Sequence, residues 1–141
     1  MVANAQAASR GELTGKVLYI EDNPINILVM TQWAARHPSL RFEVSENGQD
    51  GVSRFASFRP DVVLLDMQLP DCDGLEVLRR LRELPAGGSV PVAIVSAFSD
   101  AAVRRDALNA GAVAYWLKPV DFSHLERELR AMLPAVPERS D

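Results

Sequence analysis

The chain has 141 residues, of which 48% are hydrophobic, and its 15 basic and 19 acidic side chains give a net charge of −4. This length suits one ordinary globular domain, and the hydrophobic fraction excludes a wholly disordered chain. The acidic balance argues against a nucleic-acid surface. No apolar run reaches the roughly 18 residues that span a bilayer, so no membrane contact is expected.

The single cysteine limits the kinds of site that the chain can hold, and the composition of the two ends predicts the domain boundaries. The single cysteine, Cys72, excludes an internal disulfide and a cysteine zinc site, and it fits a cytoplasmic location. Residues 1–15 are rich in small and polar side chains and predict a flexible leader or linker without a secretory signal. Residues 134–141 carry two prolines and predict a short tail, so the folded domain is expected over residues 16–133.

Five short apolar runs predict five strands. They cover residues 17–20, 42–45, 62–65, 90–95 and 113–117. Most of the runs are rich in Val, Ile and Leu without strict alternation, which is typical of strands buried on both faces. The run at 42–45 alternates apolar and polar side chains, which places that strand nearer an edge of the sheet.

The segment after the first strand predicts a helix. Asn23 suits its N-cap and Pro24 its first turn, and the helix is expected to run to about Arg36. Much of its surface is apolar, including Ile25, Leu28, Val29 and Trp33. His37, which follows this helix, is expected on the surface.

Four further helices are expected along the chain. Three of them cover residues 49–58, 101–109 and 122–133. The remaining one places Leu75, Leu78 and Leu81 on one stripe and ends at Pro85. His124, in the last helix, is also expected on the surface. Strand and helix alternate five times, which predicts an α/β fold with a parallel sheet covered by helices on both faces.

Parallel sheets of this kind carry their sites at the carboxyl ends of the strands. Glu21 and Asp22 follow the first run and Asp66 follows the third, whereas Ser96 follows the fourth and Lys118 the fifth. Three carboxylates in one crevice repel one another unless a cation lies among them. An all-oxygen cluster suits Mg²⁺, and a lysine and a hydroxyl nearby suit a phosphoryl group. An aspartate can itself accept a phosphoryl group, so the pattern indicates phosphoryl chemistry.

Four motifs in this order resemble the receiver domain of bacterial two-component response regulators. They are VLYIEDN at residues 17–23, DMQLPDCDG at 66–74, VSA at 95–97 and YWLKP at 115–119. The resemblance extends from about residue 16 to residue 133 and therefore covers most of the chain. It implies a flavodoxin-like (βα)5 fold, a doubly wound five-stranded parallel sheet with strand order 2-1-3-4-5.

The resemblance assigns roles to the acidic residues. It implies that Asp66 is the phosphoacceptor and a metal ligand. Asp22 is then a direct Mg²⁺ ligand, and Glu21 acts through water. The backbone carbonyl of Gln68 is implied as a further metal ligand.

It also assigns roles to residues on the last two strands. Ser96 and Lys118 are implied to hold the phosphoryl group, and Tyr115 is implied to be the switch aromatic, which swings inward when Ser96 moves toward that group. Pro70 and Gly74 shape the loop after the phosphoacceptor.

The end of the last strand combines one family feature with one departure from the family. The bond that precedes Pro119 is expected to be cis, as it usually is in the family. Trp116 stands where a smaller aliphatic residue is common, so it is expected to repack the surface around the last strand and last helix.

The implied function is a phosphorelay signalling switch. A histidine kinase or histidine phosphotransfer protein supplies the phosphoryl group, and the domain catalyses only its own phosphorylation and dephosphorylation. A downstream protein target, or a second copy in a homodimer, binds the face formed by the fourth helix, last strand and last helix. The chain is then a single-domain regulator or the receiver of a hybrid kinase. Two alternatives stay open, a phosphorylation-independent docking module and a small Mg²⁺-dependent phosphatase, although the chain is short for the latter.

Overall fold

A computed structural model describes residues 12–134, so most of the predicted leader and tail lie outside the described residues. The strands are β1 (Gly15–Ile20), β2 (Leu40–Ser45), β3 (Val62–Asp66), β4 (Val92–Ser96) and β5 (Ala114–Leu117). The helices are α2 (Pro24–Ala35), α3 (Gly48–Phe58), α4 (Gly74–Glu83), α5 (Ala101–Asn109) and α6 (Phe122–Met132). Within this described part, no helix is both long enough and apolar enough to cross a membrane.

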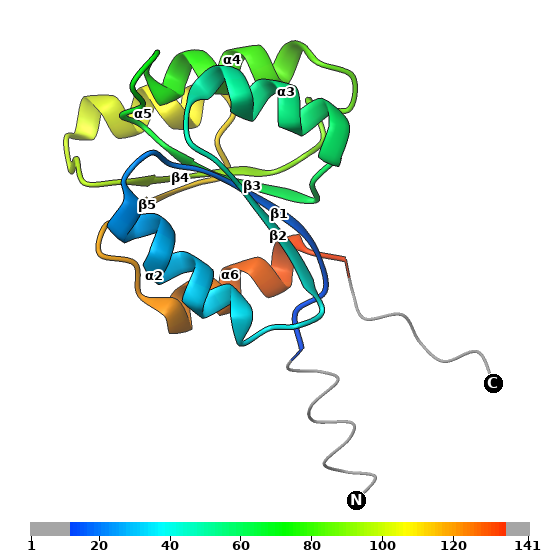
Figure 1. The fold of residues 1–141 in the computed structure, drawn as a ribbon. Coiled ribbons are helices and arrows are strands. Elements are labelled where there is room, and N and C mark those ends of the chain that lie inside the picture. Colours follow the sequence, from blue (N-terminus) through cyan, green and yellow to red (C-terminus); the bar gives the residue numbers. More distant parts are fainter. Residues whose placement is uncertain (1–11, 135–141) are drawn as a thin grey trace, which may run out of the picture.

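The five strands form one parallel sheet in the order β2-β1-β3-β4-β5, which confirms the predicted topology (Figure 1). All residues of β3 and β4 are buried, as their continuous apolar runs predicted. The alternating strand β2 lies at one edge, as expected. The chain first winds from β1 outward to β2 and then returns to β3, so β1 and β3 flank the point where the winding direction reverses.

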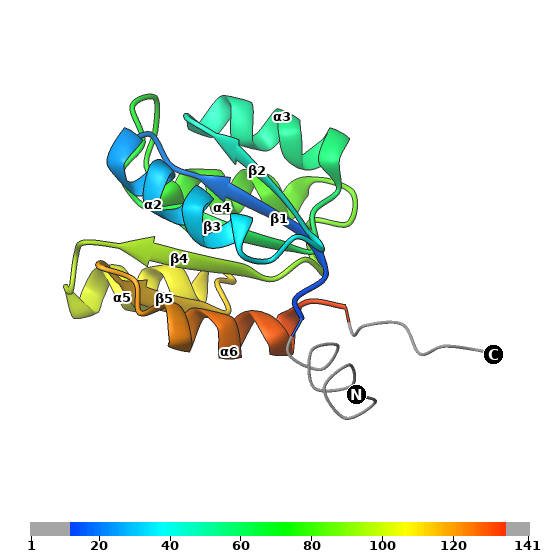
Figure 2. The ribbon, with the colours of Figure 1, turned by 60° about the horizontal axis from the view of Figure 1, so that its bottom comes forward.

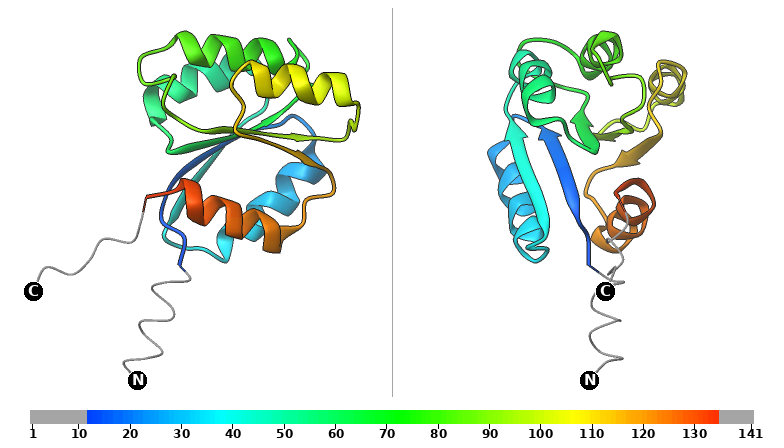
Figure 3. Two further views of the ribbon diagram at one scale, coloured as in Figure 1. Left: turned by 180° about the vertical axis from the view of Figure 1, so that it is seen from behind. Right: turned by 90° about the vertical axis from the view of Figure 1, so that its right-hand side faces the viewer.

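Helices cover both faces of this sheet. Figure 3 shows α2 and α6 on one face and α3, α4 and α5 on the other. Successive residues of β1 point into the two layers, since Leu18 and Ile20 pack with α3 and α4 whereas Val17 and Tyr19 pack with α2 and α6. Each layer is a separate apolar cluster, and together they hold the strand ends in one rigid frame.

The packed part of the chain begins slightly before the predicted boundary at residue 16. Leu13 is 1% exposed and belongs to the cluster beneath α2 and α6. The backbone amide of Lys16 donates to Asp61 at 2.8 Å, which ties the start of β1 to the turn before β3. Residues 12–15 therefore contribute to the domain.

A polar side chain caps the start of each helix. Asn23 accepts hydrogen bonds from the amides of Ile25 and Asn26 at 2.9 and 3.1 Å, which confirms the predicted start of α2. The caps of the remaining helices are Asn47, Asp73, Asp100 and Asp121. These caps place the helix starts at the carboxyl ends of the strands.

Only part of the apolar surface predicted for α2 is buried. The helix packs through Met30, Trp33 and Ala34. Three other apolar side chains remain largely exposed: Ile25 at 70%, Leu28 at 56% and Val29 at 44%. We call these three residues the α2 patch.

Both histidines are more buried than predicted. His37 is half-buried because its ring packs on Trp33, 4.9 Å away, and its Nε2 lies 3.3 Å from Glu126 of α6. His124 meets Trp116 edge-on at 5.8 Å, so Trp116 links β5 to α6 as its size suggested. Both rings are thus only partly exposed, because each of them packs on a tryptophan.

Burial at α4 and exposure at α2 predict a large and a small effect, respectively, of a leucine-to-alanine substitution on stability. Leu78→Ala removes a fully buried side chain and should lower the free energy of unfolding by about 2–5 kcal/mol. Leu28→Ala, in the α2 patch, should change it by less than about 0.5 kcal/mol. Urea unfolding followed by circular dichroism measures both, and equal losses would contradict this packing.

Candidate functional site

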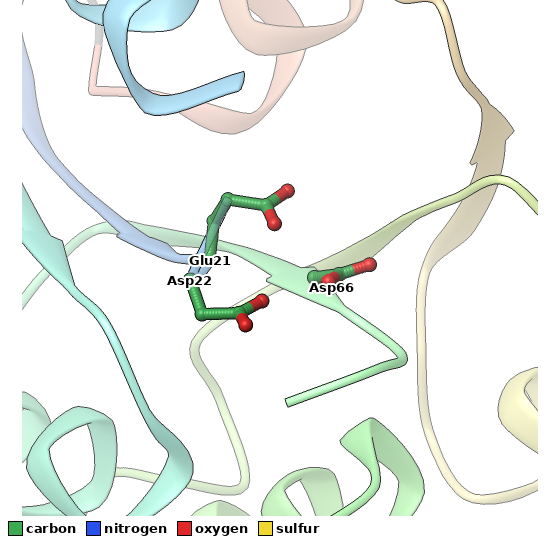
Figure 4. Close-up of side chains that lie close together, drawn as sticks. All are labelled: Glu21, Asp22 and Asp66. Atoms are coloured by element: carbon green, nitrogen blue, oxygen red, sulfur yellow. The ribbon is translucent and has the colours of Figure 1, made fainter. Parts of the chain in front are cut away.

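Three carboxylates meet at the carboxyl ends of β1 and β3. Glu21, Asp22 and Asp66 each offer one oxygen that lies within 4.8 Å of the others. Glu21 and Asp66 are 1% and 6% exposed, whereas Asp22 is open to solvent. Figure 4 shows the first two residues following β1, with their carboxylates directed to the same side as that of Asp66. Such a set of hard oxygen donors fits a divalent cation such as Mg²⁺.

Strand register explains why these side chains converge. In the parallel pairing of β1 with β3, Ile20 lies level with Leu65, so the next residues, Glu21 after β1 and Asp66 at the end of β3, emerge together. More than forty positions separate Asp22 from Asp66 in the sequence, but the sheet brings both residues to the same edge. The site therefore lies at the reversal point between β1 and β3.

Lys118 lies between two of the carboxylates. Its Nζ is 2.7 Å from Oε1 of Glu21 and 3.3 Å from Oδ1 of Asp66. Burial by itself would lower the pKa of Lys118, but the hydrogen bonds and negative charges of these two partners raise it overall. The ammonium therefore stays charged and offsets part of the negative charge in the site.

Glu21 accepts hydrogen bonds from its own strand and from the start of α2 as well. The hydroxyl of Tyr19 donates to its Oε1 at 3.0 Å, and Nδ2 of Asn26 reaches the same oxygen at 3.4 Å. The backbone amide of Asn23 donates to Oε2 at 3.2 Å. Sequence reasoning missed Tyr19 and Asn26, although Tyr19 precedes Glu21 by two positions and thus shares its face of the strand.

The pKa of Asp66 is raised from 3.8 to about 6. Burial is the largest cause and the negative charge of Glu21 adds to it, whereas Lys118 acts in the opposite direction. A cation among the carboxylates would lower this pKa again, because it favours the charged form. A bound cation would therefore reduce the electrostatic repulsion between Glu21 and Asp66.

Ser96 and Tyr115 lie on the neighbouring strands. Ser96 is buried, and its Oγ accepts a hydrogen bond from the backbone amide of Phe98 at 3.1 Å. The ring of Tyr115 lies inward, 6% exposed, and its hydroxyl donates to the carbonyl of Phe98 at 3.0 Å. The amide of Lys118 also donates to the carbonyl of Ser96 at 2.8 Å. The loop after β4 therefore contacts both Ser96 and Tyr115, the residues for which the resemblance implies a switch role.

The loop after β3 folds back tightly on its strand. A Cβ on Gly74 would lie 2.6 Å from the carbonyl oxygen of Asp66, so only glycine fits this approach. The amide of Gly74 donates to the carbonyl of Met67 at 2.8 Å, and Gln68 pairs with Asp73 in an isolated antiparallel bridge. The loop-shaping role of Gly74 stays a prediction, which this close approach supports.

The metal-binding role of the Gln68 carbonyl and the loop-shaping role of Pro70 stay predictions. Gln68 and Pro70 are both exposed. The Lys118–Pro119 bond is cis, as the resemblance implied.

Asp71 ties this loop to α3, which sequence reasoning did not foresee. Its two carboxylate oxygens accept hydrogen bonds from the amides of Gly48 and Gln49 at 2.8 and 2.9 Å. These two amides, Gly48 first, hold the pKa of Asp71 below its usual value. Asn47, the N-cap of α3, and Asp71 thus share the free amides at the start of that helix.

The raised pKa of Asp66 predicts a pH-dependent stability of the metal-free protein. Between pH 3.8 and about 6 the native state holds more protons on Asp66 than the unfolded state does. The resulting stabilisation is complete below this range and is lost as the pH rises through 6. Asp66→Asn should therefore raise the free energy of unfolding in EDTA by about 1–3 kcal/mol at pH 7.5 and by much less at pH 4.

Urea titrations of the wild type and the variant at both pH values measure this difference. Glu83→Gln, an exposed change at the end of α4, is the matched control and should have the same small effect at both pH values. An equal effect of Asp66→Asn at the two pH values would contradict the electrostatic account.

Comparison with known proteins agrees with this geometry. The family model of the response regulator receiver domain matches residues 17–130. The transcriptional regulatory protein TrcR of Mycobacterium tuberculosis is 34% identical over 118 residues, which are 84% of this chain and 45% of TrcR. The response regulator ArlR of Staphylococcus aureus is 31% identical over 124 residues, which are 88% of this chain and 55% of ArlR. The chain thus spans about half the length of these two relatives.

A solved structure with the same architecture supports the assignment. It is the receiver domain of the sensor histidine kinase PA1611 from Pseudomonas aeruginosa PAO1, with a magnesium ion coordinated in its active site cleft. It is 29% identical to this chain with a TM-score of 0.75, and the match covers 84% of this chain and 97% of that domain. Motif order, sheet topology and the match of a family model over most of its length all lead to one conclusion: the chain belongs to the response regulator receiver domain family.

Proposed function

We propose that this domain is a phosphorelay signalling switch whose phosphoacceptor is Asp66. The observation that carries the proposal is the meeting of Asp66 with Lys118, Glu21 and Asp22 at one edge of the sheet. The family supports a histidine kinase or a histidine phosphotransfer protein as the phosphoryl donor.

The carboxylates fit Mg²⁺ as the cofactor. Asp22 and Asp66 would be direct ligands together with the Gln68 carbonyl, and Glu21 would act through water. Mg²⁺ supplies positive charge that offsets the charge on the phosphoryl oxygens during transfer. The magnesium ion in the PA1611 receiver domain supports this assignment.

The chain's own residues account for the transfer step. A carboxylate oxygen of Asp66 attacks the phosphorus of a phosphohistidine, so that a P–O bond forms and the P–N bond breaks. The imidazole nitrogen keeps the electron pair of the broken bond and leaves. Lys118 turns its ammonium toward one phosphoryl oxygen, and the hydroxyl of Ser96 donates to another. The domain catalyses only its own phosphorylation and dephosphorylation.

Movement of Ser96 would reach the output surface through the loop after β4. The amide of Phe98 donates to the Ser96 hydroxyl, and the carbonyl of the same residue accepts from Tyr115. A cavity of about 270 Å³ adjoins Tyr115 and Trp116 on the face formed by α5, β5 and α6. Exposed Leu108 and Leu117 support the binding of a downstream protein, or of a second copy, on this face.

The phosphoryl donor would dock on the α2 patch. The helix begins two residues after Asp22, and Ile25, Leu28 and Val29 are exposed on its first two turns. Figure 2 brings this helix forward together with α6. An apolar surface next to the phosphoacceptor suits a helical donor that must place its phosphohistidine over Asp66.

The domain would act in the cytoplasm, either as a single-domain regulator or as the receiver part of a hybrid kinase. The PA1611 structure supports the second arrangement, because it is the receiver domain of a sensor histidine kinase.

Phosphorylation is tested by incubating the protein with Mg²⁺ and acetyl phosphate and following its intact mass. One hydroxylamine-sensitive phosphoryl adduct is expected in the wild type, because an acyl phosphate reacts with hydroxylamine. No adduct is expected in Asp66→Asn or in EDTA. Glu83→Gln should be labelled like the wild type.

Failure to form the adduct is followed by a measurement of beryllofluoride binding with Mg²⁺. Binding without a trapped adduct would indicate fast hydrolysis or a strict need for the partner. Absence of both would favour the phosphorylation-independent docking module, whereas turnover of an external phosphate ester would favour the phosphatase.

Docking on the α2 patch predicts a separation between protein and small-molecule donors. Leu28→Arg should reduce the rate of transfer from a purified histidine kinase that phosphorylates the wild type by at least about tenfold, since burial of a charge opposes docking. Its labelling by acetyl phosphate should be unchanged, because the side chain of Leu28 is 56% exposed and acetyl phosphate needs no protein docking surface. An unchanged transfer rate from the kinase would place the donor elsewhere.

A further inference from the structure

The carboxylate of Glu21 is surrounded by hydrogen-bond donors from three different elements. Oε1 accepts from Lys118 at 2.7 Å, from Tyr19 at 3.0 Å and from Asn26 at 3.4 Å. Oε2 accepts from the amide of Asn23 at 3.2 Å. An oxygen with two lone pairs is saturated by such a set, so the orientation of this carboxylate is fixed by its neighbours.

Among these donors, Tyr19 is the one inside the core. Its side chain is 1% exposed and lies in the apolar layer beneath α2 and α6, with its ring 6.1 Å from that of Phe42. An aliphatic side chain would fill an apolar layer without bringing in a polar group. The hydroxyl is directed to the carboxylate, and its bond to Glu21 avoids the penalty of a buried group without a partner.

The donors differ in whether they stay with Glu21 during phosphoryl transfer. Lys118 divides its ammonium between Glu21 and Asp66, and in the proposed reaction it turns to the phosphoryl group. Tyr19 has no such second task.

We propose that Tyr19 is a positioning residue that holds the Glu21 carboxylate directed at the metal site, whether or not Lys118 is engaged with a phosphoryl group. This inference rests on the proposed function of the site as a Mg²⁺-dependent phosphoacceptor. It assigns a task to a residue two positions before the acidic pair, inside the strand rather than after it. Mutation of groups that orient metal-binding side chains commonly costs about 10- to 100-fold in metal affinity.

Tyr19→Phe tests the proposal, because it removes the hydroxyl and keeps the ring that packs against Phe42. Titration with MgCl₂ alone, followed by calorimetry, should give a dissociation constant about tenfold higher than that of the wild type. Trp33→Phe is the matched control, since Trp33 lies in the same apolar layer and donates to a carboxylate, Glu126, away from the site. The control should leave the affinity for Mg²⁺ within about twofold of the wild type, an expectation that follows from its separate hydrogen-bond partner.

A second pair of variants separates positioning from a general structural effect. In a Glu21→Gln background, adding Tyr19→Phe should change the affinity for Mg²⁺ by less than about twofold, because the carboxylate to be positioned is gone. A purely structural role would weaken binding equally in both backgrounds. Urea unfolding in EDTA shows whether each variant is folded at the temperature of the titration.

The outcomes distinguish this inference from the proposed function. Unchanged or tighter Mg²⁺ binding by Tyr19→Phe overturns the inference alone, provided that the wild type binds Mg²⁺ and is labelled on Asp66. An equal loss of Mg²⁺ affinity on adding Tyr19→Phe to the Glu21→Gln variant also overturns the inference and leaves the proposed function intact. Absence of Mg²⁺ binding and of labelling in the wild type overturns the proposed function and the inference together.

Discussion

The organisation of this domain depends on balancing negative charge where β1 and β3 end. Glu21 and Asp66 are both nearly fully buried, and charges of the same sign at such a distance destabilise each other. The ammonium of Lys118, delivered from the end of β5, lies within hydrogen-bonding reach of both. The strand order determines how far Lys118 must reach. It follows β5, an edge strand, and its side chain extends past the end of β4 toward Asp66 on β3 and Glu21 after β1.

Charge balance also connects the site to the rest of the fold. A change in the charge of Asp66 alters the negative charge that the Lys118 ammonium offsets. The backbone amide of Lys118 donates a hydrogen bond to the carbonyl of Ser96. From Ser96 the contacts continue through Phe98 to Tyr115. The route uses one loop and two adjacent strands, so a local electrostatic event has a short path to the surface formed by α5, β5 and α6.

Much of the fold and of the site could be predicted from the sequence, because their signals are local. The apolar runs identify the strands, and the rule of carboxyl ends then places Asp66, Glu21 and Lys118 together without any knowledge of distances. The roles of Ser96 and Tyr115 came from the family resemblance and stay predictions. Asn23 was recognised as a cap because the Asn-Pro pair is itself a local signal.

What sequence reasoning missed depends on contacts between distant segments. His37 is half-buried because Trp33 and Glu126, 93 positions apart, are joined across α2 and α6. Neither that packing nor the exposure of the α2 patch can be inferred from the period of a helix that is apolar almost all around. The hydroxyl of Tyr19 was overlooked for a different reason, since a tyrosine within an apolar run is read as part of the core.

The bond between Asp71 and the start of α3 has a mechanical consequence. A helix normally finishes its first turn with caps from its own sequence, but here a carboxylate from the loop after β3 completes it. Two hydrogen bonds thus couple the first turn of α3 to that loop. A ligand that stiffens the loop beside Asp66 would lengthen the lifetime of a helix turn to which it makes no direct contact, and the edge of the molecule around β2 and α3 would sense the occupancy of the site.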